Sequence, residues 1–166
     1  MIDSLTALQV REREARSPEQ VVSEARRVAP RAARGRRLTP AFARRRTFPV
    51  PQLLNGVEEP WTVGFLVDVI LTRDCWMHRV DLARATGRDL ELTAAHDGLI
   101  VDDVVREWAA RHGRSYQLEL TGLAGGRWSS DGPGELESLC MDAIEFCRTI
   151  SGRETGVGLL TTEVPF

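Results

Sequence analysis

The hydrophobic period of the chain changes at Gly113, and this change restricts the fold more than any other feature. Before Gly113, apolar residues recur at helical spacing, most regularly over residues 61–85 and 94–112. After it, residues 116–120 and 135–139 alternate between apolar and polar, which is typical of strands. Residues 141–150 return to helical spacing, and residues 158–160 are predicted to form a last strand. We therefore expect an α+β fold, with a mainly helical part at residues 1–113 and a small α+β domain at residues 114–166.

Capping and turn residues predict where several elements begin and end. Ser17-Pro18-Glu19-Gln20 predicts a helix start, with serine as the N-cap, proline in the first turn and glutamine completing a capping box. Gly87 and Gly113 are predicted to end their helices as C-cap glycines. Asn55-Gly56 is a turn dipeptide inside residues 48–60, which we expect to form an irregular connector.

The composition is that of an ordinary globular protein. The 166 residues are 42% hydrophobic and 28% charged, and the net charge is −2. No apolar run reaches the length of a membrane helix, and the N-terminus does not resemble an export signal. Three cysteines without a C-x-x-C pair are typical of free thiols. We therefore expect a cytoplasmic protein without a membrane partner.

The basic residues are all arginine, and they are unevenly distributed. All 22 basic residues are arginine, and twelve of these lie between Arg11 and Arg46, against four glutamates. A GC-rich genome would explain the absence of lysine. The block lacks interleaved aromatic residues and any nucleic-acid-binding motif, so we interpret it as a solvated helical surface and do not expect a nucleic-acid partner.

Asp74 and His78 are the candidate metal ligands. They lie four residues apart in a helical run, so both side chains fall on one helix face. A carboxylate oxygen and a neutral imidazole nitrogen suit a divalent transition metal, although two ligands do not complete a site. The alternatives are a structural histidine and an ion pair of Asp74 with Arg73, Arg79 or the arginine block. Cys75 points about 100° away from Asp74, so we expect it to pack rather than to ligate.

Four segments give the chain a family resemblance. They are the sequences WMHRVDLARATG at residues 76–87, EWAARHG at 107–113, EFCRTISGR at 145–153 and LLTTEVPF at 159–166. Together they resemble the mycothiol-dependent maleylpyruvate isomerase family, over nearly the whole chain. The resemblance implies a DinB-like four-helix bundle followed by a small C-terminal domain. It also implies two cofactors, a divalent metal that is usually zinc, and the thiol mycothiol.

The chain departs from the pattern of this family at one metal ligand. The family holds its metal with a histidine near the N-terminus and with an acidic-x-x-x-His pair, which Asp74 and His78 match. No histidine precedes His78, and we expect the chain to lack the first bundle helix of the family. His96 and His112 lie about 24 Å apart along one predicted helix, so they cannot share a metal, and we interpret both as structural. We expect either an N-terminally truncated chain or a fold that has lost its metal.

Three functions are therefore hypotheses. The first is a mycothiol-dependent isomerase or thiol transferase acting on an electrophilic small molecule. Because the metal site is incomplete, whether the chain is an active enzyme stays open. The second is a non-catalytic binding or interaction module, in which an exposed apolar face predicts a homodimer. The third is a nucleic-acid binder that uses the arginine block. Arg148 and Arg153 are candidates for contact with an anionic substrate or the thiol, although we interpret them as surface arginines.

Overall fold

The structure, a computed structural model, has the expected α+β fold and describes residues 2–54 and 56–166. The chain divides into two compact units, Met1–Arg44 and Arg45–Phe166. Within the described residues, no helix combines the length and the apolar composition needed to cross a membrane.

The first unit consists of helices α1 (Ile2–Arg13), α2 (Pro18–Leu38) and α3 (Ala41–Arg44). The predicted start of α2 is confirmed, because the Ser17 hydroxyl accepts a hydrogen bond from the Gln20 N–H while the Gln20 side chain accepts one from the Ser17 N–H. Glu24 of α2 binds two arginines from α1 and its following turn, Arg13 at 3.2 Å and Arg16. These ion pairs hold the two helices together as a hairpin.

The second unit begins with a small hairpin that the sequence did not predict. Strands β1 (Gln52–Leu54) and β2 (Val57–Glu59) pair antiparallel, so the segment is not simply an irregular connector. Gly56 lies in the predicted turn with a φ of 78°, a conformation that favours glycine, whereas Asn55 lies outside the described residues.

Two long helices follow the hairpin. A π-helical turn, η1 (Phe65–Ile70), leads directly into α4 (Leu71–Thr86), and α5 spans Asp97–His112. Gly87 and Gly113 end these helices in the left-handed conformation, with φ values of 63° and 61°, as predicted. The start of α5 is later than expected because the Asp97 carboxylate accepts hydrogen bonds from the N–H and hydroxyl of Thr93 across the turn before it.

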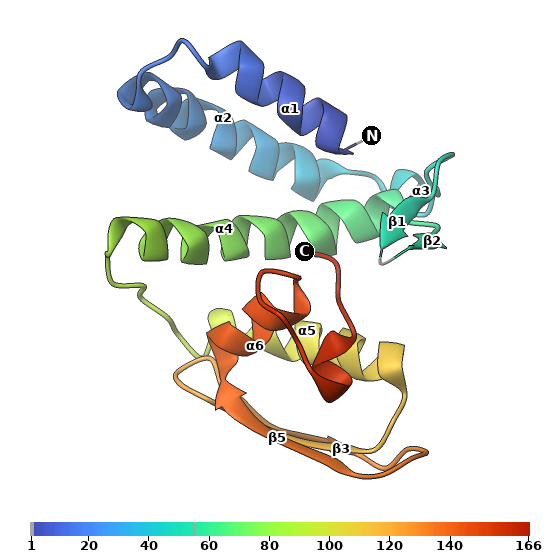
Figure 1. Ribbon diagram of the computed structural model, residues 1–166. Helices are drawn as coiled ribbons and strands as arrows, with labels where there is room; N and C mark the ends of the chain where they lie inside the picture. Colours follow the sequence, from blue (N-terminus) through green and yellow to red (C-terminus); the bar gives the residue numbers. More distant parts are fainter. Residues whose placement is uncertain (1, 55) are drawn as a thin grey trace. The chain divides into compact units, whose positions relative to one another are not determined.

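A three-stranded sheet completes the second unit (Figure 1). Strand β3 (Tyr116–Thr121) lies in the centre, antiparallel to β4 (Gly126–Ser130) and parallel to β5 (Glu137–Asp142). Helix α6 (Ala143–Ile150) follows β5 and, with α5, covers one face of the sheet (Figure 1).

The predicted last strand at residues 158–160 is wrong, because these residues form a 3₁₀ turn, η2 (Gly158–Thr161). The Leu159 N–H donates to the Glu137 carboxylate, and both Leu159 and Leu160 are buried. A strand would have placed two successive side chains on opposite faces.

The core of the second unit is centred on Trp108. This side chain is fully buried, makes edge contacts with the rings of Tyr116 and Phe146, and donates from Nε1 to the Leu159 carbonyl oxygen at 3.1 Å. Residues of α4, α5, β3 and α6 belong to the same core cluster. Gly113, where we placed a domain boundary, therefore lies inside one compact unit, with core residues on both sides of it.

Candidate metal half-site on helix α4

Helix α4 turns one face into the core and presents the candidate ligands on the other. Trp76, Met77 and Val80 are buried on the inner face. The side chains of Asp74 and His78 are 42% and 61% exposed. Their spacing brings Asp74 Oδ1 to 3.3 Å from His78 Nε2, so the two predicted ligands do meet on one face.

The separation of these two atoms fits a shared tetrahedral ion. Zinc binds carboxylate oxygen and imidazole nitrogen at about 2.0–2.1 Å, and two ligands of a tetrahedron with that radius stand about 3.3 Å apart. The exposure of both side chains leaves room for further ligands. Across residues 2–54 and 56–166, however, no group of three or more His, Cys, Asp or Glu side chains is arranged so that it could hold a metal ion. Asp74 and His78 therefore form a metal half-site.

Two of the arginines proposed as alternative partners of Asp74 are engaged elsewhere. Arg73 is buried and binds the carboxylates of Asp103 and Glu107. Arg79 binds Asp97. Both guanidinium groups thus have carboxylate partners on α5, which leaves the Asp74 carboxylate facing His78.

A second carboxylate, Asp81, lies on the other side of the His78 ring. Its Oδ2 is 3.4 Å from His78 Nδ1, and Arg153 binds it with Nε at 3.2 Å from both carboxylate oxygens and with a terminal nitrogen at 3.0 Å from Oδ2. Burial raises the pKa of Asp81, but hydrogen bonds and charge from Arg153 and His78 outweigh burial and bring the pKa below its ordinary value. Asp81 was not among the predicted ligands, although its position three residues after His78 places it on the same helix face.

Arg148 and Arg153 are not the free surface arginines that we expected. The Arg148 side chain is only 11% exposed, donates to Glu154 at 2.6 Å and lies 3.6 Å from Asp81. The Arg153 guanidinium binds Asp81, and the Arg153 side chain is 25% exposed. Both arginines therefore extend the Asp74–His78–Asp81 line of side chains toward the end of α6.

The remaining histidines and Cys75 lie outside the half-site. His96 precedes α5, and its side chain is 65% exposed. His112 ends α5, and its Nδ1 accepts a hydrogen bond from the Arg114 N–H while its ring contacts Trp108 edge-on. Cys75 is exposed, so the expectation that it packs against other side chains is wrong. The side of α4 that faces the core is formed by Trp76, Met77 and Val80 instead.

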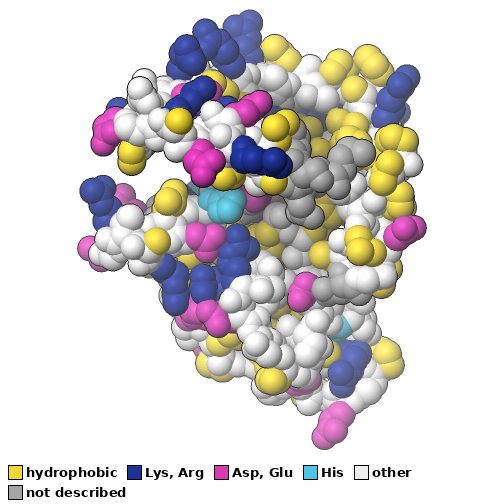
Figure 2. All heavy atoms as spheres, turned by 45° about the horizontal axis from the view of Figure 1, so that its top comes forward, with side chains coloured by type: hydrophobic (Ala, Val, Ile, Leu, Met, Phe, Trp, Pro, Cys, Tyr) yellow, Lys and Arg dark blue, Asp and Glu magenta, His cyan; other side chains and the backbone are white. Residues whose placement is uncertain are grey.

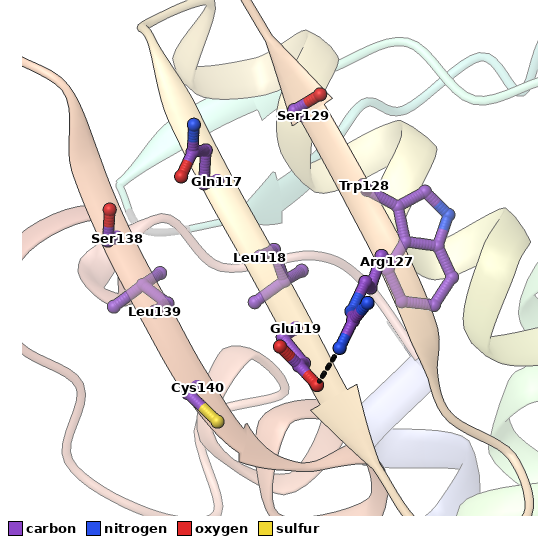
Figure 3. Close-up of a pocket in the computed structure, with 9 residues that line it drawn as sticks. All are labelled: Gln117, Leu118, Glu119, Arg127, Trp128, Ser129, Ser138, Leu139 and Cys140. Carbon is purple, nitrogen blue, oxygen red and sulfur yellow. Dashed lines mark hydrogen bonds and ion pairs between the residues drawn. The ribbon is translucent and has the colours of Figure 1, made fainter.

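A hollow of about 430 Å³ lies over the three-stranded sheet (Figure 3). Its charged residues, Arg127 and Glu119, bind each other at 2.8 Å, and their side chains are 80% and 46% exposed. Cys140 on the neighbouring strand β5 is exposed there. An ion pair between neighbouring strands and one thiol do not form a catalytic group. The other lining residues are Gln117, Leu118, Trp128, Ser129, Ser138 and Leu139.

Six of the twelve arginines of the block lie on α2. Five of its exposed side chains are those of Arg26, Arg27, Arg31, Arg34 and Arg37. Exposed Val21, Val22 and Val28 belong to the same helix. On the face drawn in Figure 2, arginine side chains form separate groups with acidic and hydrophobic side chains between them. This arrangement agrees with a solvated helical surface.

Comparison with known proteins does not add a relative from which a role could be transferred. Searches of the chain against models of protein families, against curated proteins and against solved structures found no match.

Proposed function

We propose that this chain is a metal- and thiol-dependent isomerase or S-transferase in which Asp74 and His78 hold a divalent metal, with zinc the expected ion. The observation that carries the proposal is the 3.3 Å separation of Asp74 Oδ1 and His78 Nε2 on an exposed face of α4. The chain resembles the mycothiol-dependent maleylpyruvate isomerase family, which holds its metal partly with an acidic-x-x-x-His pair, and this resemblance supports the same two ligands and names mycothiol as the thiol.

The side chains of this half-site bind and orient, and they leave the chemistry to the metal and the thiol. When bound, the metal would favour the thiolate form of a coordinated thiol, which is the form that adds to an activated double bond. Asp74 and His78 would supply two ligands to the metal, and the thiol, water or a ligand from another chain would supply the others. Arg148 and Arg153 place positive charge beside the half-site, where an anionic substrate would be attracted.

We place this activity in the cytoplasm. All three cysteines, Cys75, Cys140 and Cys147, are free thiols, which suits a reducing compartment. The partners in this proposal are the small-molecule thiol and an electrophilic substrate.

Metal content tests the proposal directly. The purified protein is equilibrated with Zn²⁺ or Co²⁺ near pH 8, freed of excess metal and measured by elemental analysis. The expected result is stoichiometric metal in the wild type and its loss in Asp74→Ala and His78→Ala. His96→Ala is the matched control, because His96 is equally exposed and lies 3.5 Å from the carboxylate of Asp97.

The outcome separates the enzyme from the non-catalytic module. A wild type that retains no metal, or variants at Asp74 and His78 that retain as much as the wild type, would favour a module without metal chemistry. If metal binds, conjugation of mycothiol to an activated alkene should require that metal and should fall in both ligand variants but not in His96→Ala.

A further inference from the structure

Another hollow of the second compact unit, of about 440 Å³, is formed by the end of α6 and the last part of the chain. Its lining comes from Thr149, from the turn at residues 152–156 and from residues 160, 161 and 163. The volume falls within the range of about 300–1,000 Å³ that is usual for small-molecule sites. The hollow is therefore large enough for a small ligand.

Two glycines allow the turn after α6 to approach the last segment of the chain closely. A Cβ atom at Gly156 would stand 2.2 Å from the Leu160 carbonyl oxygen, so a larger residue would require a shift of the backbone. A Cβ atom at Gly152, whose φ is 76°, would lie 3.5 Å from the Glu163 carboxylate. The Val164 N–H donates to the carbonyl oxygen of residue 150 at 2.9 Å and holds the segment that carries Glu163 against the end of α6. Backbone contacts thus fix the walls of the hollow.

The charged residues of the lining leave one negative charge without a partner. Arg153 donates to the carboxylate of Asp81 and to the Ser151 hydroxyl, and Glu154 accepts a hydrogen bond from Arg148 at 2.6 Å. Glu163 is partly buried, and it has no hydrogen bond or ion pair with any residue that the structure describes. The hollow therefore suits a cation better than an anion.

Two hydroxyl groups of the lining can only accept hydrogen bonds from a ligand. Thr149 Oγ1 donates to the Glu145 carbonyl oxygen at 2.8 Å, and Thr161 Oγ1 donates to the Gly158 carbonyl oxygen at 2.8 Å. A hydroxyl has one proton and two lone pairs, so both oxygens keep acceptor capacity after these bonds are made. Because a carboxylate also only accepts, a ligand of this hollow has to supply N–H or O–H donors.

We propose that this hollow binds a small hydroxylated primary amine in its protonated form, with Glu163 as the partner of the ammonium group. An ammonium group has three donors and no acceptor, which matches a carboxylate flanked by the acceptor hydroxyls of Thr149 and Thr161. Hydroxyl groups on the ligand suit Thr155, since its exposed hydroxyl can both donate and accept. The proposal goes beyond the metal- and thiol-dependent function and does not depend on it.

A structural role for Glu163 makes a different prediction. Without a partner in the described residues, the carboxylate has no contact whose loss would destabilise the fold. Glu163→Gln should therefore leave the midpoint of urea unfolding unchanged while it weakens binding of the amine. A lower midpoint together with unchanged binding would show that Glu163 is structural and would overturn the proposal.

Titration with a matched pair of sugars, followed by the backbone amide shifts of the ¹⁵N-labelled protein, tests the proposal. The probes are glucosamine at a pH where its amine is protonated, and glucose, which has a hydroxyl group in place of the ammonium. Glucosamine should shift the amide signals of residues 149–163 in a saturable way, and glucose should bind at least tenfold more weakly. No saturable shift with glucosamine, or equal binding of the two sugars, would overturn the proposal.

Variants assign the binding to the hollow. Glu163→Gln should weaken the binding of glucosamine about tenfold or more, because it removes a charge-assisted hydrogen bond, and should leave the binding of glucose unchanged. The matched control is Glu135→Gln, which removes the same charge from an exposed residue outside the hollow and should bind glucosamine as the wild type does. Inorganic phosphate is the opposing probe: saturable shifts of residues 149–163 with phosphate instead of glucosamine would assign the hollow to anions and overturn the proposal.

Discussion

Replacing Arg73 with methionine is expected to lower the free energy of unfolding by about 3 kcal/mol. The Arg73 side chain is 2% exposed. Its guanidinium binds Asp103 at 2.7 and 3.0 Å, Glu107 at 2.6 Å and the Pro165 carbonyl oxygen at 3.2 Å. Methionine keeps much of the length and apolar bulk of the side chain, so the change removes charge and hydrogen bonds rather than packing.

The three partners of Arg73 would contribute different amounts to this loss in the free energy of unfolding. The Asp103 side chain is 56% exposed, so water can replace the guanidinium. Glu107 is less exposed but keeps Arg111 at 2.7 Å. The Pro165 carbonyl oxygen loses its donor in a buried contact, which costs about 1–3 kcal/mol. About 1 kcal/mol from the two partly compensated carboxylates brings the total to about 3 kcal/mol, the lower end of the range for a broken buried pair.

Urea unfolding followed by tryptophan fluorescence measures this loss in the second compact unit. All four tryptophans, Trp61, Trp76, Trp108 and Trp128, belong to that unit. The control is Arg106→Met, because the Arg106 side chain is 75% exposed and binds Asp102 at 2.7 Å in a solvent-screened ion pair, which contributes little to stability. A loss in Arg73→Met no larger than that in Arg106→Met would refute the idea that the buried guanidinium stabilises the unit.

Asp97 is 2% exposed, and its pKa is lowered to about 2 because hydrogen bonds from Thr93 and Trp76 and the charge of Arg79 outweigh the opposing effect of burial. At pH values above the unfolded-state pKa of about 3.8, the ionised form should add about 2 kcal/mol to the free energy of unfolding, and this contribution should be lost as the pH falls toward 2. Asp97→Asn should remove that part of the pH dependence of the urea midpoint. Burial, and secondarily the charge of Arg114, lowers the pKa of His112. Since the fold favours the neutral ring, stability should decline as the pH falls below about 6.5, and the difference between pH 5 and pH 8 should shrink in His112→Gln. Iodoacetamide should label the exposed Cys75 and Cys140 in the native protein. Cys147 should react only after unfolding, because it is buried and burial raises the pKa of its thiol; mass spectrometry would reveal any earlier labelling of Cys147.

Helix ends were predictable where the chemistry that forms them is local. Ser17 and Gln20 form their capping box within four residues, and Gly87 and Gly113 adopt the left-handed conformation that ends a helix. The later start of α5 shows the limit of such patterns. The Asp97 carboxylate is fixed by Trp76 and Arg79 from another helix, and no pattern near residue 97 reveals these partners.

Elements that depend on distant partners were missed or misassigned. Residues 158–160 have an apolar pattern that suits a strand, but Glu137 caps the turn from 22 residues away. Strand β5 was suggested by its alternation, whereas its parallel pairing with β3 depends on the connection through β4.

The candidate site likewise contains residues that local spacing could predict and one that only the fold brings in. Helical periodicity was enough to bring Asp74 and His78 together, and it would have been enough to find Asp81. Arg153 lies 72 residues after Asp81, and only the fold brings it to that carboxylate.

Helix α4 allows one test of whether the half-site and the core act independently. Trp76, Met77 and Val80 are buried on its inner face, so the backbone that carries Asp74 and His78 is already ordered, and binding has mainly side chains to fix. A metal that binds only the folded chain raises the free energy of unfolding by about 2.7 kcal/mol at one hundred times its Kd. We expect this increment to be the same in the wild type and in Arg73→Met. Arg73 points about 100° and 140° around α4 from Asp74 and His78 and binds the carboxylates of Asp103 and Glu107 instead, so the two effects should add. An increment that shrinks in Arg73→Met, measured by urea unfolding with and without Zn²⁺, would instead show that the buried arginine also preorganises the metal ligands.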